Sequence, residues 1–151
     1  MGIKLKVTAF IGFMLFSFAH ADETNFNAVQ GHLEFLGYKC EQNKDRIICK
    51  TEAASLNLAV FKRGAGFLLI STFKQKPEAQ KNRAELNQLL NEMNQNSLAS
   101  RYYADNDTVF LEAFQPGNYQ KENFAVILAQ FQNDWEQNLR KLKDRIVRLM
   151  G

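Results

Sequence analysis

The sequence predicts an α+β fold, in which an antiparallel sheet has helices packed on one face. Two observations predict it. Apolar residues recur every three or four positions in three long segments, as in amphipathic helices, and two groups of short alternating segments lie between them, as strands do. The expected order is α-β-β-β-β-α-β-β-α, which favours α+β. A chain of 151 residues with 46% hydrophobic and 23% charged residues suits one globular domain and excludes a large multidomain enzyme or a disordered chain.

The first 21 residues have the three parts of a secretory signal peptide. Lys4 and Lys6 form a basic start, Val7 to Ala19 is almost entirely apolar, and Ala19-His20-Ala21 fits a cleavage site. The alternative is an uncleaved membrane anchor, but a spanning helix needs about 20 apolar residues and this run is shorter. We therefore expect cleavage after Ala21, a single domain over residues 22–151 and a periplasmic or secreted protein. Because both lysines leave and all 16 acidic residues stay, the formal charge falls from +3 to +1.

The first element expected after this leader is a helix from Asn25 to Leu36. Its apolar residues follow steps of three and four, Thr24 or Asn25 would cap its start, and Gly37 would end it. His32, the one histidine outside the leader, lies at the edge of the apolar stripe. We interpret it as a boundary residue rather than a ligand, because a histidine and cysteine zinc site would need further ligands.

Cys40 and Cys49 are predicted to form a disulfide across a β-hairpin. Two strands, 38–42 and 47–50, flank Asn43-Lys44-Asp45-Arg46, and pairing Gln42 with Ile47 places the two cysteines opposite each other. An exported protein with two cysteines most simply forms one disulfide. A redox-active pair is the alternative, but it usually needs the Cys-x-x-Cys spacing, which is absent.

The middle of the chain alternates between strands and one helix. Strands are expected over 55–62 and 67–73, joined by a turn at Arg63-Gly64-Ala65-Gly66, and Pro77 opens a helix that runs to about Gln95. Two further strands, 98–104 and 108–114, surround Asp105-Asn106-Asp107. That triplet fails the EF-hand spacing for calcium and is interpreted as a hairpin turn.

The last predicted helix, residues 121–150, carries the longest apolar stripe: Phe124, Ile127, Leu128, Phe131, Trp135, Leu139, Leu142, Ile146 and Leu149. At ~1.5 Å per residue the helix is ~43 Å long, which exceeds the ~36 Å diameter expected of the domain. We therefore expect it to bend or to project, with residues from about 136 to 151 as a helical extension. Five basic residues interleave with the end of the stripe: Arg140, Lys141, Lys143, Arg145 and Arg148.

Several segments together resemble a known family. The first helix ends in Phe35-Leu36-Gly37-Tyr38, hairpins precede the middle helix, and the Asn-rich segment 86–94 leads into Ala99-Ser100-Arg101-Tyr102-Tyr103 and the strand 108–112. This arrangement, over roughly residues 25–135, resembles the YbjN-like family and the type III secretion chaperone-like fold that it shares. The resemblance implies a small non-enzymatic protein that binds other proteins, often as a dimer, and it implies no catalytic residue. The leader, the disulfide and the C-terminal extension depart from that family.

These observations predict an exported, non-enzymatic binding or adaptor protein of the bacterial envelope, without metal or cofactor. Its partner is expected to be a protein or a second copy, bound by Trp135, Leu139, Leu142, Ile146 and Leu149 and the five basic residues. A solvated face over an ordinary core and adsorption on an anionic membrane stay open as other interpretations of this segment. Nucleic acid is not expected, because the rest of the domain is close to neutral.

The sequence leaves two other function classes open. One is an inhibitor of a secreted hydrolase that inserts the Asp105-Asn106-Asp107 loop. The other is a small envelope hydrolase that uses paired carboxylates, for which Glu34, Glu41 and Glu112 are available.

Overall fold

The fold is a single antiparallel sheet with helices on one face. The structure, a computed structural model, describes residues 18–51 and 56–151. The sheet has six strands in the order β1-β2-β3-β4-β6-β5, each antiparallel to its neighbours. The elements are α1 (Phe18–Phe35), β1 (Lys39–Asn43), β2 (Arg46–Lys50), β3 (Leu58–Arg63), β4 (Gly66–Lys74), α2 (Pro77–Lys81), α3 (Arg83–Asn96), β5 (Arg101–Asp105), β6 (Thr108–Pro116) and α4 (Lys121–Leu149). The predicted fold class and element order are confirmed.

Helix α1 begins earlier than the sequence pattern indicates. It starts at Phe18, so the prediction that Thr24 or Asn25 caps its start is wrong. Most of the predicted leader, residues 1–17, lies outside the described residues, and the predicted cleavage point after Ala21 falls within α1. The helix ends at Phe35, and Gly37 turns the chain with φ of 90°, which only glycine adopts without strain.

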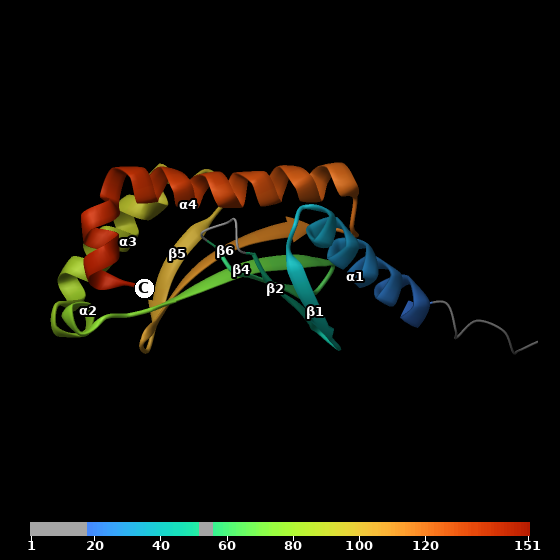
Figure 1. The fold of residues 1–151 in the computed structure, drawn as a ribbon, viewed down its shortest axis with the longest axis horizontal. Helices are drawn as coiled ribbons and strands as arrows, with labels where there is room; N and C mark the ends of the chain where they lie inside the picture. Colours follow the sequence, from blue (N-terminus) through green and yellow to red (C-terminus); the bar gives the residue numbers. More distant parts are fainter. Residues whose placement is uncertain (1–17, 52–55) are drawn as a thin grey trace, which may run out of the picture.

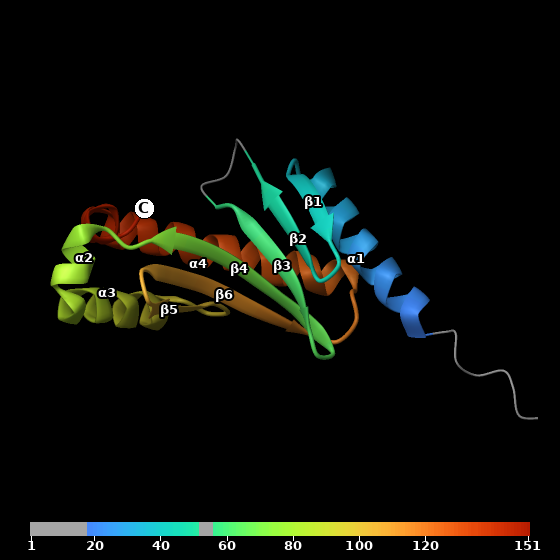
Figure 2. The same ribbon diagram turned by 90° about the horizontal axis from the view of Figure 1, so that it is seen from below.

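The helices cover only one face of the sheet. Side chains of alternate strand residues point to this face and are buried, including Ile47, Val60, Leu69 and Leu111. Helix α4 lies along the face, and the ring of Trp135 stacks on Phe73 with centroids 4.5 Å apart. Figure 1 shows α4 above β4, β5 and β6, with α1 beside β1 and β2. Seen from below, β3, β4 and β6 lie in front of α4, and none of the described helices crosses their near face (Figure 2).

The middle helix is broken where a single helix is expected. Asn82 leaves the helical region with φ of −126° and ψ of 73°, which separates α2 from α3. Its side chain accepts a hydrogen bond from the backbone N–H of Glu85 at 3.1 Å and so caps α3. An asparagine inside the predicted helix therefore acts as the cap of its second half.

Helix α4 bends rather than projects. Leu142 has non-helical dihedral angles, φ −125° and ψ 18°, and beyond it Ile146 and Leu149 join the core of the domain. The chain end then pairs with the end of β4: the N–H of Lys74 donates to the carbonyl of Gly151 at 2.8 Å, and the N–H of Gly151 donates back at 3.0 Å. Figure 1 shows the bend and the C-terminus against the sheet.

The predicted disulfide is present. Cys40 lies opposite Cys49 in the β1–β2 pair, their sulfurs are bonded, and their Cα atoms are 4.1 Å apart. Asn43 pairs with Arg46, so the turn contains only Lys44 and Asp45 and is shorter than the predicted turn of four residues. Cys49 is fully buried, and the bridge therefore ties the outermost strand to the core.

Candidate functional site

The most distinctive feature of the sheet is that β5 is shorter than its neighbour β6 and leaves one end of β6 without a partner strand on that side among the described residues. β5 pairs with β6 only as far as Arg101 opposite Glu112, whereas β6 continues to Pro116 and stays paired with β4 along its whole length. Among the described strands, residues 113–116 therefore have a neighbour on one side only. We call this segment the free end of β6.

The hydrogen-bonding pattern along β6 shows which groups this leaves open. Asp105 and Thr108 close a two-residue hairpin, in which the closing pair exchanges both backbone hydrogen bonds. Every second residue from Thr108 to Glu112 therefore points its N–H and C=O at β5, and the residues between point at β4. The next residue in this alternation is Phe114, whose N–H and C=O point to the side where β5 has ended. Proline at position 116 has no N–H to leave open on that side.

A buried carboxylate explains why β5 stops. The sequence pattern predicts a strand from Leu98, but the side chain of Asp134 on α4 accepts the backbone N–H groups of Leu98, Ala99 and Ser100 at 3.1, 3.1 and 2.9 Å. Asp134 is fully buried, so these charge-assisted hydrogen bonds are strong. They hold the chain away from β6, and the strand begins at Arg101.

The outer edge of β5 is closed by a side chain. The amide of Asn94 donates to the carbonyl of Tyr102 at 2.9 Å and accepts its N–H at 2.6 Å, which reproduces the pairing of a neighbouring strand. Asn138 on α4 supports the same region by donating to the carbonyl of Met93 at 3.2 Å and to the hydroxyl of Tyr102 at 3.4 Å. Here the Asn-rich segment of the sequence protects an edge strand.

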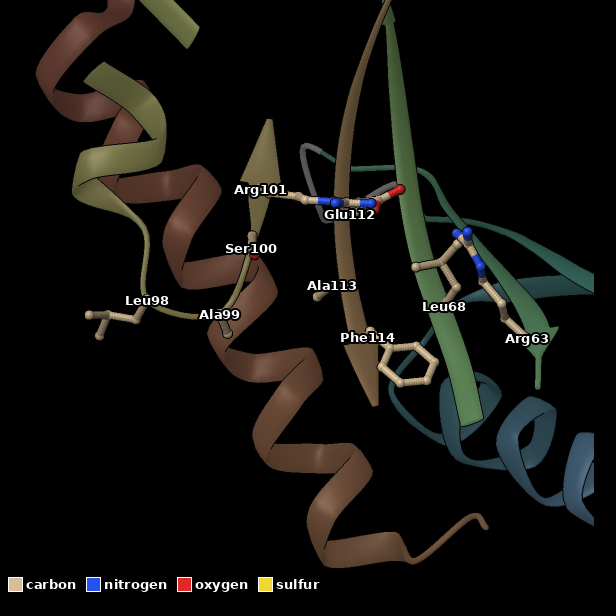
Figure 3. A pocket seen from close by; sticks show the side chains of 9 residues that line it. All are labelled: Arg63, Leu68, Leu98, Ala99, Ser100, Arg101, Glu112, Ala113 and Phe114. Carbon is tan, nitrogen blue, oxygen red and sulfur yellow. Dashed lines mark hydrogen bonds and ion pairs between the residues drawn. The ribbon is translucent and has the colours of Figure 1, made fainter. Parts of the chain in front are cut away.

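A hollow of about 540 Å³ surrounds the free end of β6. Figure 3 shows residues 98–100 curving away from β6 on one side, with the other lining side chains over β6, β4 and β3. The lining consists of Arg63, Leu68, Leu98, Ala99, Ser100, Arg101, Glu112, Ala113 and Phe114. Leu98 is 83% exposed and Phe114 47% exposed, so large apolar side chains border the hollow. Apolar borders with convergent polar groups are typical of binding sites.

The charged groups of the hollow carry an excess of one positive charge. Arg101 forms an ion pair with Glu112, whose other carboxylate oxygen accepts the hydroxyl of Tyr103 at 3.0 Å. Partial burial raises the pKa of Tyr103, and its hydrogen bond to Glu112 raises that pKa further. The carboxylate of Glu112 is buried but the side chain of Arg101 is 68% exposed, so part of its guanidinium stays open to solvent. Arg63 has no ion pair among the described residues.

The structure corrects the prediction that the stripe of α4 is a free docking surface. Trp135, Ile146 and Leu149 are buried, and Leu139 and Leu142 pack partly buried against the same core. The bend at Leu142 makes this possible, because it turns the last part of the helix onto α2 and α3. The apolar residues therefore stabilise the fold, as in the interpretation of an ordinary core.

The basic residues of α4 are mostly engaged within the chain. Arg145 pairs with Glu92 at 2.5 Å, and Arg148 pairs with Glu85; both glutamates lie on α3. Arg140 lies 3.7 Å from Glu136, and Lys141 donates to Asn96 at 3.0 Å. Lys143 is exposed. These contacts join α4 to α3, and a role of the five residues in partner binding stays a prediction.

The remaining candidates of the sequence lie apart from the hollow, except Glu112. His32 shares a hydrogen bond with Tyr119 at 2.9 Å, and burial and then the charge of Lys121 lower its pKa. Asn106 adopts φ of 51° in the β5–β6 turn, as expected for a turn residue. Glu34 and Glu41 lie on α1 and β1. In the described ranges, acidic, histidine and cysteine side chains nowhere gather in a group suited to a metal ion.

Pattern reasoning missed Arg63, Leu98 and Phe114 as site residues. The alternation of β6 offered a signal, because Phe114 shares a face with Glu112 and lies opposite the core face. Nothing local marked the role of Asp134, which acts on a segment more than thirty residues away in sequence. None of the helices over residues 18–51 and 56–151 is long and apolar enough to span a bilayer.

Comparisons with known proteins show the fold. No family model matches the sequence, and no curated protein matches it. Among solved structures, the chain is similar to YbjN, a proposed transcription regulator from E. coli, with a TM-score of 0.66 and 14% sequence identity over 83% of this chain and 95% of that one. The likeness covers nearly the whole of the other protein, and the chain therefore has a YbjN-like fold.

Proposed function

We propose that this chain is a non-enzymatic protein-binding module, which binds an extended segment of a partner protein along the free end of β6. The feature that carries the proposal is the backbone of Phe114, whose N–H and C=O face no strand among the described residues and lie beside a hollow with exposed apolar borders. A strand added to an exposed sheet edge gains main-chain hydrogen bonds, and neighbouring side chains supply specificity.

The architecture of the hollow supports pairing with an added strand. The partner strand would continue the line of β5 beside β6. This position is open because the hydrogen bonds to Asp134 hold residues 98–100 away from it. The partner strand would be antiparallel to β6, as every pair in this sheet is, and the residue opposite Phe114 would exchange two hydrogen bonds with it. Leu98 and Phe114 would be covered by the bound segment.

The side chains of the hollow favour binding over hydrolysis. A carboxylate hydrolase needs two converging acids, and Glu112 is the one acidic residue in the lining. Its carboxylate is held by Arg101 and Tyr103, which suits a structural charge more than a proton donor.

The location that we propose is the bacterial envelope, in the periplasm or outside the cell. The Cys40–Cys49 disulfide supports it, because such bonds persist in oxidising compartments. The signal-peptide pattern of the first 21 residues supports it as well.

An arrayed library of random ten-residue peptides tests the binding proposal. We expect a subset to bind, and we expect a backbone N-methyl group at the residue opposite Phe114 to abolish binding, since it removes one of the two exchanged hydrogen bonds. Phe114→Pro removes the other N–H and is expected to weaken binding at least about tenfold, because one main-chain hydrogen bond and its geometry are lost.

Two control variants separate the backbone from other effects. Phe114→Ala keeps the N–H and is expected to retain strand pairing with a smaller apolar contribution. Gln42→Pro removes an outward N–H from β1, the strand at the opposite edge of the sheet, and is expected to leave binding unchanged. Binding that survives both N-methylation and Phe114→Pro would refute the proposal.

A further inference from the structure

We infer that the bound segment carries an acidic side chain, Glu or Asp, at the residue that pairs with Phe114. This inference rests on the proposed function and names the chemistry of the partner. The observations behind it are the alternation of the sheet faces and the positive charge of the hollow.

The face of the sheet on which this side chain lies follows from the register. Paired residues of neighbouring strands point their side chains to the same face. Phe114 lies on the face of the sheet that the described helices leave uncovered. Glu112 lies on the same face, as does Leu68 on β4, which pairs with Phe114. The partner residue opposite Phe114 would therefore point its side chain onto this face, where Figure 3 shows Arg101, Glu112, Leu68 and Arg63 together.

The guanidinium of Arg101 is a charged group close to that side chain. The partner residue would occupy the line of β5, two residues before Arg101, and same-face residues two positions apart on a strand are about 6.6 Å apart. Arg101 extends over β6 to reach Glu112 and remains 68% exposed. A guanidinium has five donors, so an acidic side chain beside it can accept those that Glu112 does not use.

The rest of the hollow favours an acid over a neutral or basic side chain. Glu112 balances only one of the two arginines, so the lining keeps one excess positive charge, and Arg63 has no ion pair among the residues described. The stem of a glutamate would pack on the ring of Phe114, as long side chains do on apolar surfaces. A lysine at the same place would meet the uncompensated charge of the arginines.

Three synthetic peptides test this inference. Each has ten residues of alternating threonine and valine between capped ends, and they differ only in a central Glu, Gln or Lys. We expect the Glu peptide to bind about threefold to tenfold more tightly than the Gln peptide, and the Lys peptide to bind more weakly than both. The difference should shrink at 1 M salt, because partly exposed charges are screened.

Substitutions of residues that line the hollow test which side chains cause the preference for the Glu peptide. The double variant R101Q/E112Q removes the guanidinium without leaving Glu112 buried and unpaired, and it should reduce the preference for Glu to less than about twofold. R63Q alters an exposed residue without an ion pair in the described part and should reduce the preference partially. Lys81→Gln, at an exposed position of α2 outside the lining of the hollow, is the control and should leave the preference for Glu unchanged.

The outcomes distinguish this inference from the proposed function. Equal binding of all three peptides, or a preference for Glu that persists in R101Q/E112Q, overturns the acidic preference and leaves strand pairing intact. Binding of none of the peptides overturns both. A homodimer that occupies the free end of β6 and is not displaced by the Glu peptide also overturns the inference.

Discussion

The substitution Asp134→Asn should destabilise the fold and release residues 98–100. The carboxylate accepts three backbone N–H groups and a fourth hydrogen bond from Gln130 at 2.8 Å. Each carboxylate oxygen accepts two of these four hydrogen bonds, so an asparagine keeps one acceptor oxygen and turns an NH₂ group towards two of the donors. At least one charge-assisted hydrogen bond is lost, and a buried donor is left without a partner.

The size of this effect follows from those two losses. A hydrogen bond to a charged group contributes about 1.5–3 kcal/mol, and an unsatisfied buried polar group costs a similar amount, so we expect the free energy of unfolding to fall by about 2–4 kcal/mol. That is a large share of the roughly 5–15 kcal/mol by which domains are stable. Urea unfolding measures the loss, and amide hydrogen exchange should become faster at residues 98–100.

Asp144→Asn is the matched control for this prediction. Asp144 lies on the same helix but is exposed, so the same substitution should change stability by less than about 0.5 kcal/mol. A loss below about 0.5 kcal/mol for Asp134→Asn as well, or unchanged exchange at residues 98–100, would refute the role assigned to Asp134.

Three further predictions concern the stability of the fold. Replacing Cys40 and Cys49 by alanine should lower the free energy of unfolding by about 2–3 kcal/mol, because the bridge closes a short loop, and unfolding with and without reductant should show the same difference. Ile146→Ala should lower the free energy of unfolding by about 2–4 kcal/mol, because Ile146 fills the core. Arg145→Ala should lower it by at most about 1 kcal/mol, because Arg145 forms a partly exposed ion pair. Equal losses for the two variants in urea titrations would contradict the buried position assigned to the end of α4. Burial and Lys121 lower the pKa of His32, so the unfolded chain binds its proton more readily; the contribution of this residue to stability is present above the unfolded value of 6.5 and is lost as the pH falls towards the folded value. Urea midpoints should therefore decline below that pH in the native chain and decline less in His32→Asn.

The parts of the fold that the sequence predicts correctly depend on local patterns. The spacing of Cys40 and Cys49 around a turn fixes their register, because opposite positions in a hairpin follow from counting residues. The order of helices and strands follows from the periods of the apolar residues. These features need no knowledge of distant contacts.

The incorrect predictions depend on distant partners. A strand starting at Leu98 agrees with local propensity, but the carboxylate of Asp134 takes the backbone N–H groups that a strand would use. Likewise, a long apolar stripe on α4 is compatible with an exposed binding surface or with a buried core. The bend at Leu142 determines that Ile146 and Leu149 are buried. The candidate site arises from the first of these contacts, so the alternation of β6 indicates the outward face of Phe114 but not the end of pairing beside it.

Hydrogen exchange at the amide of Phe114 tests the central claim most directly. We expect this amide to exchange rapidly in the free protein while those of its neighbours Ala113 and Gln115, which point at β4, are protected. Saturation with the Glu peptide should then protect Phe114. Slow exchange of Phe114 in the free protein, or no added protection when the peptide is bound, would contradict a free strand end that binds a partner.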